Sequence, residues 1–231
     1  MTQASQWARW LRGIGILAGT VLVHELAHAL AAWRVGAPVK EVAVGFGPRL
    51  FSRKFKDTTV SLRPILLGGY AAIEMESLPP QRRAPVLLAG PFANLLLGLL
   101  LMPRRVTMVD PTAPPADGLP GDGGESPAPV PKVQISGVLG AMAMLARVRD
   151  ADTLRSMAGQ INLSVGLTNL LPLMPLDGGH LALAKMESRG VGAAGRDLFK
   201  HTTALLFFWL LLQVIAGDLR RLRSGAGPYP A

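Results

Sequence analysis

Residues 21–30 have the sequence VLVHELAHAL, which sets two histidines and a glutamate inside an otherwise apolar run expected to be helical. His24 and His28 are four residues apart, so on a helix both imidazoles lie on one face. Two such imidazoles can bind one zinc ion, and Glu25 beside them can take a proton from a water that the ion activates. This HExxH spacing is typical of zinc hydrolases. The alternative, two core histidines bonded to other helices, would leave Glu25 without a cationic partner in the segment.

The composition indicates a polytopic α-helical membrane protein. The 231-residue chain is 49% hydrophobic and 17% charged, and its mean hydropathy is +0.32. Ionisable groups inside a membrane span are costly, so the histidines and the glutamate indicate a functional site. The net charge is +9, with basic residues at the ends of apolar runs, so we expect a lipid bilayer as partner and no nucleic acid. Because cysteine is absent, a metal must be bound by histidine, aspartate or glutamate.

Four apolar stretches predict about four transmembrane helices, at about residues 14–33, 84–102, 157–176 and 202–216. Alternating valines around the KFKD turn (54–57) predict a membrane-associated β-hairpin region between the first two helices. Residues 107–132 are rich in proline and glycine, which predicts a flexible linker within a single domain formed by residues 1–231. Residues 34–85 hold more lysine and arginine than residues 104–156, which places the β-hairpin region in the cytoplasm.

A catalytic zinc ion usually has three protein ligands, and the segment NLLPLMPLDGGH (169–180) offers Asp177 as the third. Pro172 and Pro175 should break the helix and leave backbone groups without hydrogen-bond partners. Within a membrane such groups are tolerated only where they are buried in protein or line a water-filled cavity. Gly178 and Gly179 would then allow a sharp turn. The alternative makes LDGG a helix-ending turn at the membrane surface.

Two of the three asparagines within the predicted transmembrane segments, Asn169 and Asn94, have expected roles. Asn169 is eight residues before Asp177. Its amide could stabilise negative charge that develops on a substrate carbonyl, or hold two helices together, and the residues alone leave both roles open. Asn94, in GPFAN (90–94), is expected to be structural, because Gly90 and Pro91 permit a close approach of helices.

Together these segments resemble the site-2 proteases, which are zinc intramembrane metalloproteases. The resemblance rests on five motifs in the family's order: HELAH (24–28), GFGP (45–48), LGGY (67–70), GPFAN (90–94) and NLLPLMPLDGGH (169–180). It implies that His24, His28 and Asp177 bind one zinc ion per chain and that Glu25 is the general base. It also implies that Asn169 and Pro172 belong to the wall of the active site.

The resemblance further implies that the β-hairpin region holds the substrate as an added strand. A helix satisfies its own backbone and resists proteolysis, so a substrate must unwind and pair elsewhere. LGGYAAI (67–73) is the candidate edge, where Gly68 and Gly69 leave room for a partner backbone beside Tyr70. The expected partner is a single-span membrane protein, such as an anti-sigma factor. Regulated intramembrane proteolysis would then occur in the cell membrane, at an active site toward the cytoplasm.

Many bacterial members carry PDZ domains between the second and third core spans. Residues 107–132 are too short for one, so we expect a minimal core without a PDZ domain. Two other functions are a catalytically idle membrane scaffold and a metal-binding transporter. The intact Glu25 argues against a scaffold, and only four histidines, two of them in one motif, argue against a transport pathway with several sites.

Overall fold

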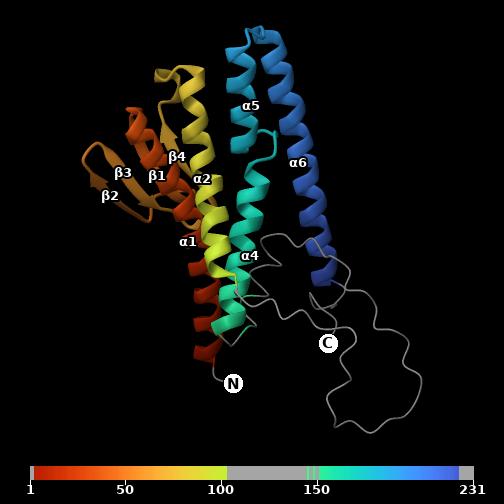
Figure 1. Cartoon of the computed structure of the whole chain (residues 1–231). Helices are drawn as coiled ribbons and strands as arrows, with labels where there is room; N and C mark the ends of the chain where they lie inside the picture. The colour runs from red at the N-terminus through yellow and green to blue at the C-terminus, as the bar shows by residue number, and fades with distance from the viewer. Residues whose placement is uncertain (1–2, 103–144, 146–147, 149–150, 224–231) are drawn as a thin grey trace, which may run out of the picture.

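The computed structural model describes residues 3–102, 145, 148 and 151–223, so the predicted linker at 107–132 lies outside the described residues. Its helices are α1 (Gln3–Val35), the 3-10 helix η1 (Met75–Ser77), α2 (Pro80–Leu101), α4 (Ala151–Asn169), α5 (Asp177–Ser188) and α6 (Ala193–Arg223). Helices α1, α2 and α4 pack side by side, and α5 continues beyond the end of α4 (Figure 1). A small sheet lies against the C-terminal half of α1 (Figure 1).

Three of the helices are long and apolar enough to cross a membrane. They contain the stretches Leu11–Val35, Pro80–Leu101 and Ala193–Arg220, which include or overlap three of the four predicted spans. The other predicted span, 157–176, is not one continuous helix. Helix α4 ends at Asn169, and residues 170–176 form bends and turns before α5 begins. The membrane class of the fold is thereby confirmed, and a fourth span remains a prediction.

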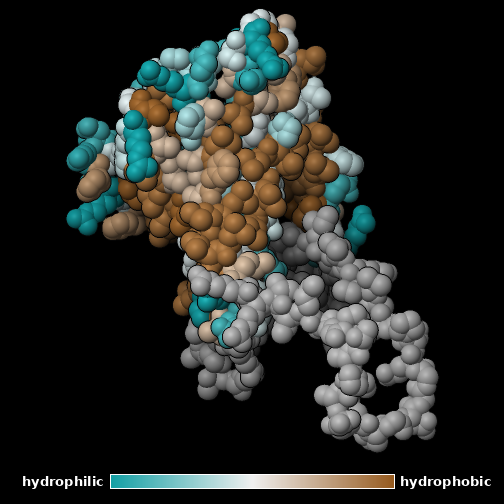
Figure 2. Space-filling model, viewed as in Figure 1, coloured by the Kyte–Doolittle hydropathy of each residue, from teal (hydrophilic) through white to brown (hydrophobic). Residues whose placement is uncertain are grey.

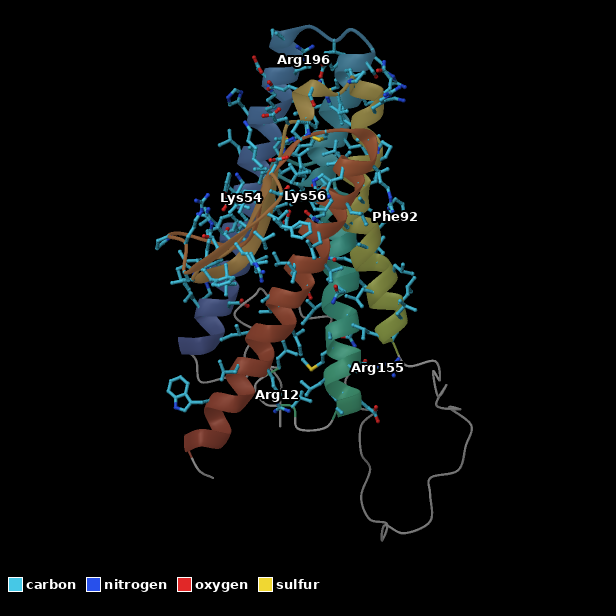
Figure 3. All side chains as sticks on the ribbon, turned by 90° about the vertical axis from the view of Figure 1, so that its left-hand side faces the viewer. Arg12, Lys54, Lys56, Phe92, Arg155 and Arg196 are labelled. Atoms are coloured by element: carbon cyan, nitrogen blue, oxygen red, sulfur yellow. The ribbon has the colours of Figure 1, made fainter. Side chains whose placement is uncertain are left out.

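The surface has the polarity expected of a protein in a bilayer. Apolar side chains cover the middle of the helices in a broad band, and hydrophilic residues gather at the upper end (Figure 2). Arg12 and Arg155 lie toward one end of the bundle and Arg196 at the other, while Phe92 projects outward between these levels (Figure 3). Charged groups thus border an apolar belt, as anchors at the two membrane surfaces do.

The sheet contains β1 (Val39–Phe46), β2 (Phe51–Phe55), β3 (Thr58–Leu62) and β4 (Ile65–Ile73), in the order β2-β3-β1-β4. The predicted hairpin is confirmed between β2 and β3, which pair antiparallel around the KFKD turn. The region is not a series of hairpins, however, because β1 pairs with β3 in parallel and with β4 antiparallel. This order leaves β4 at one edge of the sheet, next to α1.

Helices α2 and α4 approach each other through glycines. A Cβ atom added at Gly98 would lie 2.9 Å from the backbone nitrogen of Leu163, and one at Gly166 would lie 2.8 Å from the carbonyl oxygen of Pro91. Small residues let membrane helices pack backbone against backbone. The close approach of α2 and α4 therefore depends on these two positions.

A buried carboxylate ties the strands together on one face of the sheet. Glu41 of β1 accepts hydrogen bonds from Ser61 of β3 (2.7 Å), Tyr70 of β4 (2.9 Å) and Arg63 (2.9 Å), and Arg49 binds it through two nitrogens. Burial opposes ionisation of Glu41, but these bonds outweigh it and lower its pKa from 4.5 to about 2. The ionised form of Glu41 therefore stabilises the sheet.

We expect this stabilisation to disappear in acid. A carboxyl whose pKa is depressed by folding stabilises the protein above its unfolded pKa of 4.5, and this contribution is lost as the pH falls toward about 2. Glu41→Gln should therefore lower the thermal unfolding midpoint in detergent at pH 7, and the difference from wild type should shrink toward pH 2. Glu76→Gln, at an exposed position, is the control. A difference independent of pH would contradict this assignment.

Candidate active site

The three predicted metal ligands converge at one point, although they come from distant parts of the chain. His24 and His28 lie on consecutive turns of α1, and Asp177 is the first residue of α5. The Nε2 atoms of the two histidines are 3.1 Å apart. Asp177 Oδ2 is 3.0 Å from His24 Nε2 and 3.3 Å from His28 Nε2. In the described part of the chain, this is the one group of histidine and acidic residues arranged to hold a metal ion.

These distances fit a tetrahedral zinc ion. Nitrogen and oxygen ligands at about 2.0–2.1 Å from zinc lie about 3.3 Å from one another. The chemistry of the donor set agrees, because His28 Nδ1 lies 2.7 Å from the carbonyl oxygen of Val86 and must donate its proton there. With the proton on Nδ1, the lone pair of His28 Nε2 faces Asp177 Oδ2. Both atoms are then hydrogen-bond acceptors, and a cation between them removes their mutual repulsion.

Gly90 of α2 gives the imidazoles their space. A Cβ atom at this position would overlap His28 Nε2 and would lie 2.7 Å from His28 Cδ2 and 2.8 Å from His24 Nε2. The absent side chain thus lets α2 close over the ligand pair. Gly90 was expected only to permit helix packing, and the motif GPFAN was the signal that could have indicated its place at the site.

The helix break before α5 positions Asp177. As predicted, the chain leaves the helix between Asn169 and Asp177, around Pro172 and Pro175. Gly178 and Gly179 act differently from the expected turn, because both lie within α5. A side chain on either would collide with the backbone of residues 170–174, which packs against this first turn. The glycines therefore allow the bend to fold back on α5.

Glu25 lies between the ligand pair and the edge of the sheet. It follows His24 on α1 and is buried. The space beside Gly69 of β4 is filled by α1, since a Cβ there would lie 2.6 Å from Val21 Cγ1 and 3.2 Å from Glu25 Cγ. The backbone amide of Ala71 also approaches the Glu25 carboxylate. Strand β4 thus adjoins the candidate base directly.

The other predicted site residues differ in what they contact. The Asn169 amide donates to the carbonyl oxygen of Val165 in its own helix (3.0 Å), and Pro172 lies exposed in the bend. Gly68 faces the ring of Phe46. The Tyr70 hydroxyl is held by Glu41 and Arg63 in the network of the sheet. The structure therefore brings together His24, His28, Asp177 and Glu25, with β4 beside them.

Substitution of Gly90 tests this geometry. We expect Gly90→Ala to lower the affinity for zinc at least about tenfold, because the added methyl group displaces the ligand imidazoles. Zinc bound per protein, measured in detergent during a chelator titration, checks the result. Gly19→Ala is the matched control, because nothing lies within 4 Å of its added Cβ. Equal zinc affinity of the Gly90→Ala variant and wild type would contradict the arrangement.

Relatives of the chain are named as zinc enzymes. A protein of Fusobacterium nucleatum named as a putative zinc metalloprotease is 38% identical over 104 residues, 40% of this chain and 31% of that protein. Two proteins of Synechocystis with the same description are 35% identical over 114 residues (43% and 31%) and 29% identical over 182 residues (78% and 33%). The chain spans about a third of the length of these relatives.

The family comparison covers most of the chain. The model of peptidase family M50 matches residues 12–116 and 125–212, which include Glu25 and the three converging ligands. The donor set accommodates the zinc ion after which the relatives are named. The chain therefore belongs to peptidase family M50, the site-2 protease family of zinc metalloproteases.

Proposed function

We propose that the chain is a zinc-dependent intramembrane endopeptidase, which hydrolyses peptide bonds within or near the transmembrane segments of membrane proteins. The observation that carries the proposal is the position of Glu25. Its carboxylate group lies on α1 next to the three converging ligands and against the backbone of β4. A base, a metal site and a strand edge thus meet within an apolar helical protein.

The residues have separate tasks in this reaction. His24, His28 and Asp177 would hold zinc, which when bound would polarise the substrate carbonyl and make a water molecule more acidic. Glu25 takes a proton from the attacking water as its oxygen bonds to the carbonyl carbon. Glu25 then delivers the proton to the amine nitrogen as the carbon–nitrogen bond breaks, which balances the hydrolysis. The buried position of Glu25 limits competition from bulk water for this proton.

Strand β4 is the proposed site for the substrate backbone. It is the edge strand of the sheet on the α1 side, and an extended segment can add to such an edge through main-chain hydrogen bonds. When the substrate helix unwinds, its backbone N–H and C=O groups lose their hydrogen bonds, which an apolar environment does not replace. Pairing with β4 as an added strand would provide new partners for these groups. Gly68, Gly69 and Tyr70 belong to this strand. Since α1 fills the space beside Gly69, the support for this role comes from the backbone edge of β4 and not from room at the glycines.

The bend after α4 is the proposed far wall of the site. Asn169 is the last residue of α4, and Pro172 lies within the bend that precedes Asp177. In the structure the Asn169 amide is bonded to its own helix, so a role at the substrate carbonyl requires a rotation of this side chain. We propose Asn169 for that role because of its place beside the bend.

The distribution of basic residues supports a proposal for the membrane orientation of the chain. We propose a cell-membrane protein with four spans, in which α4 and the bend form the third, and with the active site toward the cytoplasm. The basic residues of 34–85 support this orientation. A single-span membrane protein, such as an anti-sigma factor, is the proposed substrate in regulated intramembrane proteolysis.

Cleavage by purified protein tests the role of Glu25. We expect wild type to cut a single-span model substrate within its span, and Glu25→Gln to bind zinc equally but cut at least about 100-fold more slowly, because the general base is lost. Cleavage is measured in detergent with both proteins at matched zinc content.

Glu76→Gln, which removes an exposed carboxylate of η1, is the control and should cut at the wild-type rate. Cleavage by Glu25→Gln at the wild-type rate would overturn the assignment of the base. Variable zinc occupancy above one ion per chain, with no cleavage, would favour a metal carrier.

A further inference from the structure

The two ligand histidines differ in how their second ring nitrogen is satisfied. A metal-bound histidine almost always donates its other N–H to a carboxylate, a carbonyl or a water, which fixes the tautomer that binds the metal. His28 Nδ1 has this partner in the carbonyl oxygen of Val86, 2.7 Å away. His24 Nδ1 is buried, and no atom of the described residues is within hydrogen-bonding range of it. The described residues therefore provide the hydrogen-bond acceptor for His28 Nδ1 but not the one for His24 Nδ1.

Three further buried polar atoms in the helical core have no hydrogen-bond partner among the residues that the structure describes. They are both side-chain atoms of Asn94 on α2 and Oδ1 of Asn162 on α4. Asn94 is 0% exposed and Asn162 is 2% exposed. A buried polar group without a hydrogen bond costs about 1–3 kcal/mol, so several in one helical core indicate a bound water.

The packing of the helices brings these groups to one level. Asn94 is one turn beyond Gly90, which lies against the ring of His24. Thr20 is one turn before His24, and α1 and α2 run in opposite directions (Figure 1), so Asn94 and Thr20 lie at a similar level. Asn162 Nδ2 donates to Thr20 Oγ1 over 3.1 Å. Asn94 thus lies where α1, α2 and α4 meet. This junction is about one helical turn from the ligand pair, toward the end of α2.

The contacts of α2 with α4 agree with this placement. Pro91 and Gly98 on α2 face Gly166 and Leu163 on α4. Asn94 is three residues from Pro91 and four from Gly98, which puts it on the same side of α2. Because Asn94 is fully buried on this side of α2, its amide lies within the helical core.

We propose that a buried water held by Asn94 and Asn162 is the hydrogen-bond partner of His24 Nδ1, so that Asn94 is a positioning residue of the metal site. The water accepts from His24 Nδ1–H and Asn94 Nδ2, and it donates to the Oδ1 atoms of Asn94 and Asn162. These bonds satisfy all four partnerless atoms and use the full capacity of one water. His24 is then held in the tautomer that presents the Nε2 lone pair to zinc. This inference rests on the proposed zinc site.

The experiment is a zinc titration of the 231-residue chain after removal of metal. We expect Asn94→Leu, which keeps the volume and removes the amide, to weaken zinc binding about 10- to 100-fold in competition with a chelator. Asn162→Leu should weaken it in the same direction. Asn94→Ser, whose hydroxyl can still bind the water, should remain closer to wild type. Gln160→Leu removes an exposed amide of α4 and is the matched control, expected to bind zinc as wild type does.

A second readout reports the tautomer without relying on catalysis. In protein with 15N-labelled histidine, we expect the His24 ring to be protonated at Nδ1 in wild type and to show a mixture of tautomers in Asn94→Leu. A purely structural role of Asn94 in helix packing would lower the unfolding midpoint of the metal-free protein and leave both the zinc affinity and the tautomer unchanged. That result would overturn the inference.

The two proposals fail in different ways. If wild type does not bind one zinc ion per chain, the proposed metal site itself is wrong. If wild type binds zinc tightly and both Asn94→Leu and Asn162→Leu bind it within about twofold of wild type, only the water-mediated positioning of His24 is wrong. Should Asn94→Leu fail to fold, Asn162→Leu and Asn94→Ser still decide between these outcomes.

Discussion

The convergence of two imidazoles and a carboxylate inside an apolar protein is the constraint on which the rest of the structure depends. Ionisable groups at this depth are tolerated when each has a partner, and here His24 and His28 meet Asp177 from the far end of the sequence. Two neighbouring elements allow these side chains to come together. Helix α2 closes over the rings because position 90 has no side chain, and the bend at 170–176 delivers the carboxylate at the start of α5.

Local patterns account for the features that the sequence could predict. The spacing of His24 and His28 defines one helix face, the prolines end α4, and the KFKD turn defines the hairpin of β2 and β3. Three apolar runs become long helices, because length and hydropathy are properties of each run by itself. The remaining run, 157–176, which is the third in chain order, combines helix with a bend, and its proline and amide content already indicated that departure.

Features that depend on distant contacts were beyond the sequence. The parallel pairing of β1 with β3 bypasses β2, and nothing in either strand specifies that neighbour. The carbonyl oxygen that fixes His28 belongs to the backbone of Val86, which has no residue-specific signal. The hydrogen bond that the Tyr70 hydroxyl donates to Glu41 joins β4 to β1, and neither residue indicates the other as its partner. All three contacts arise from packing between elements that are distant in the sequence. Local sequence patterns do not specify such packing.

The large sequence separation between His24 and Asp177 affects the conformational entropy of the unfolded chain. The bond between His24 and Asp177 joins residues 153 positions apart, so a metal ion held by both closes a loop that contains most of the chain. Closing a long loop removes much of the conformational entropy of the unfolded state, and a metal bound only by the folded chain adds its binding free energy to folding. A zinc ion held by these residues would therefore act as a reversible cross-link between the N-terminal helix and the C-terminal half, as a disulfide does in other proteins, in a chain that has no cysteine.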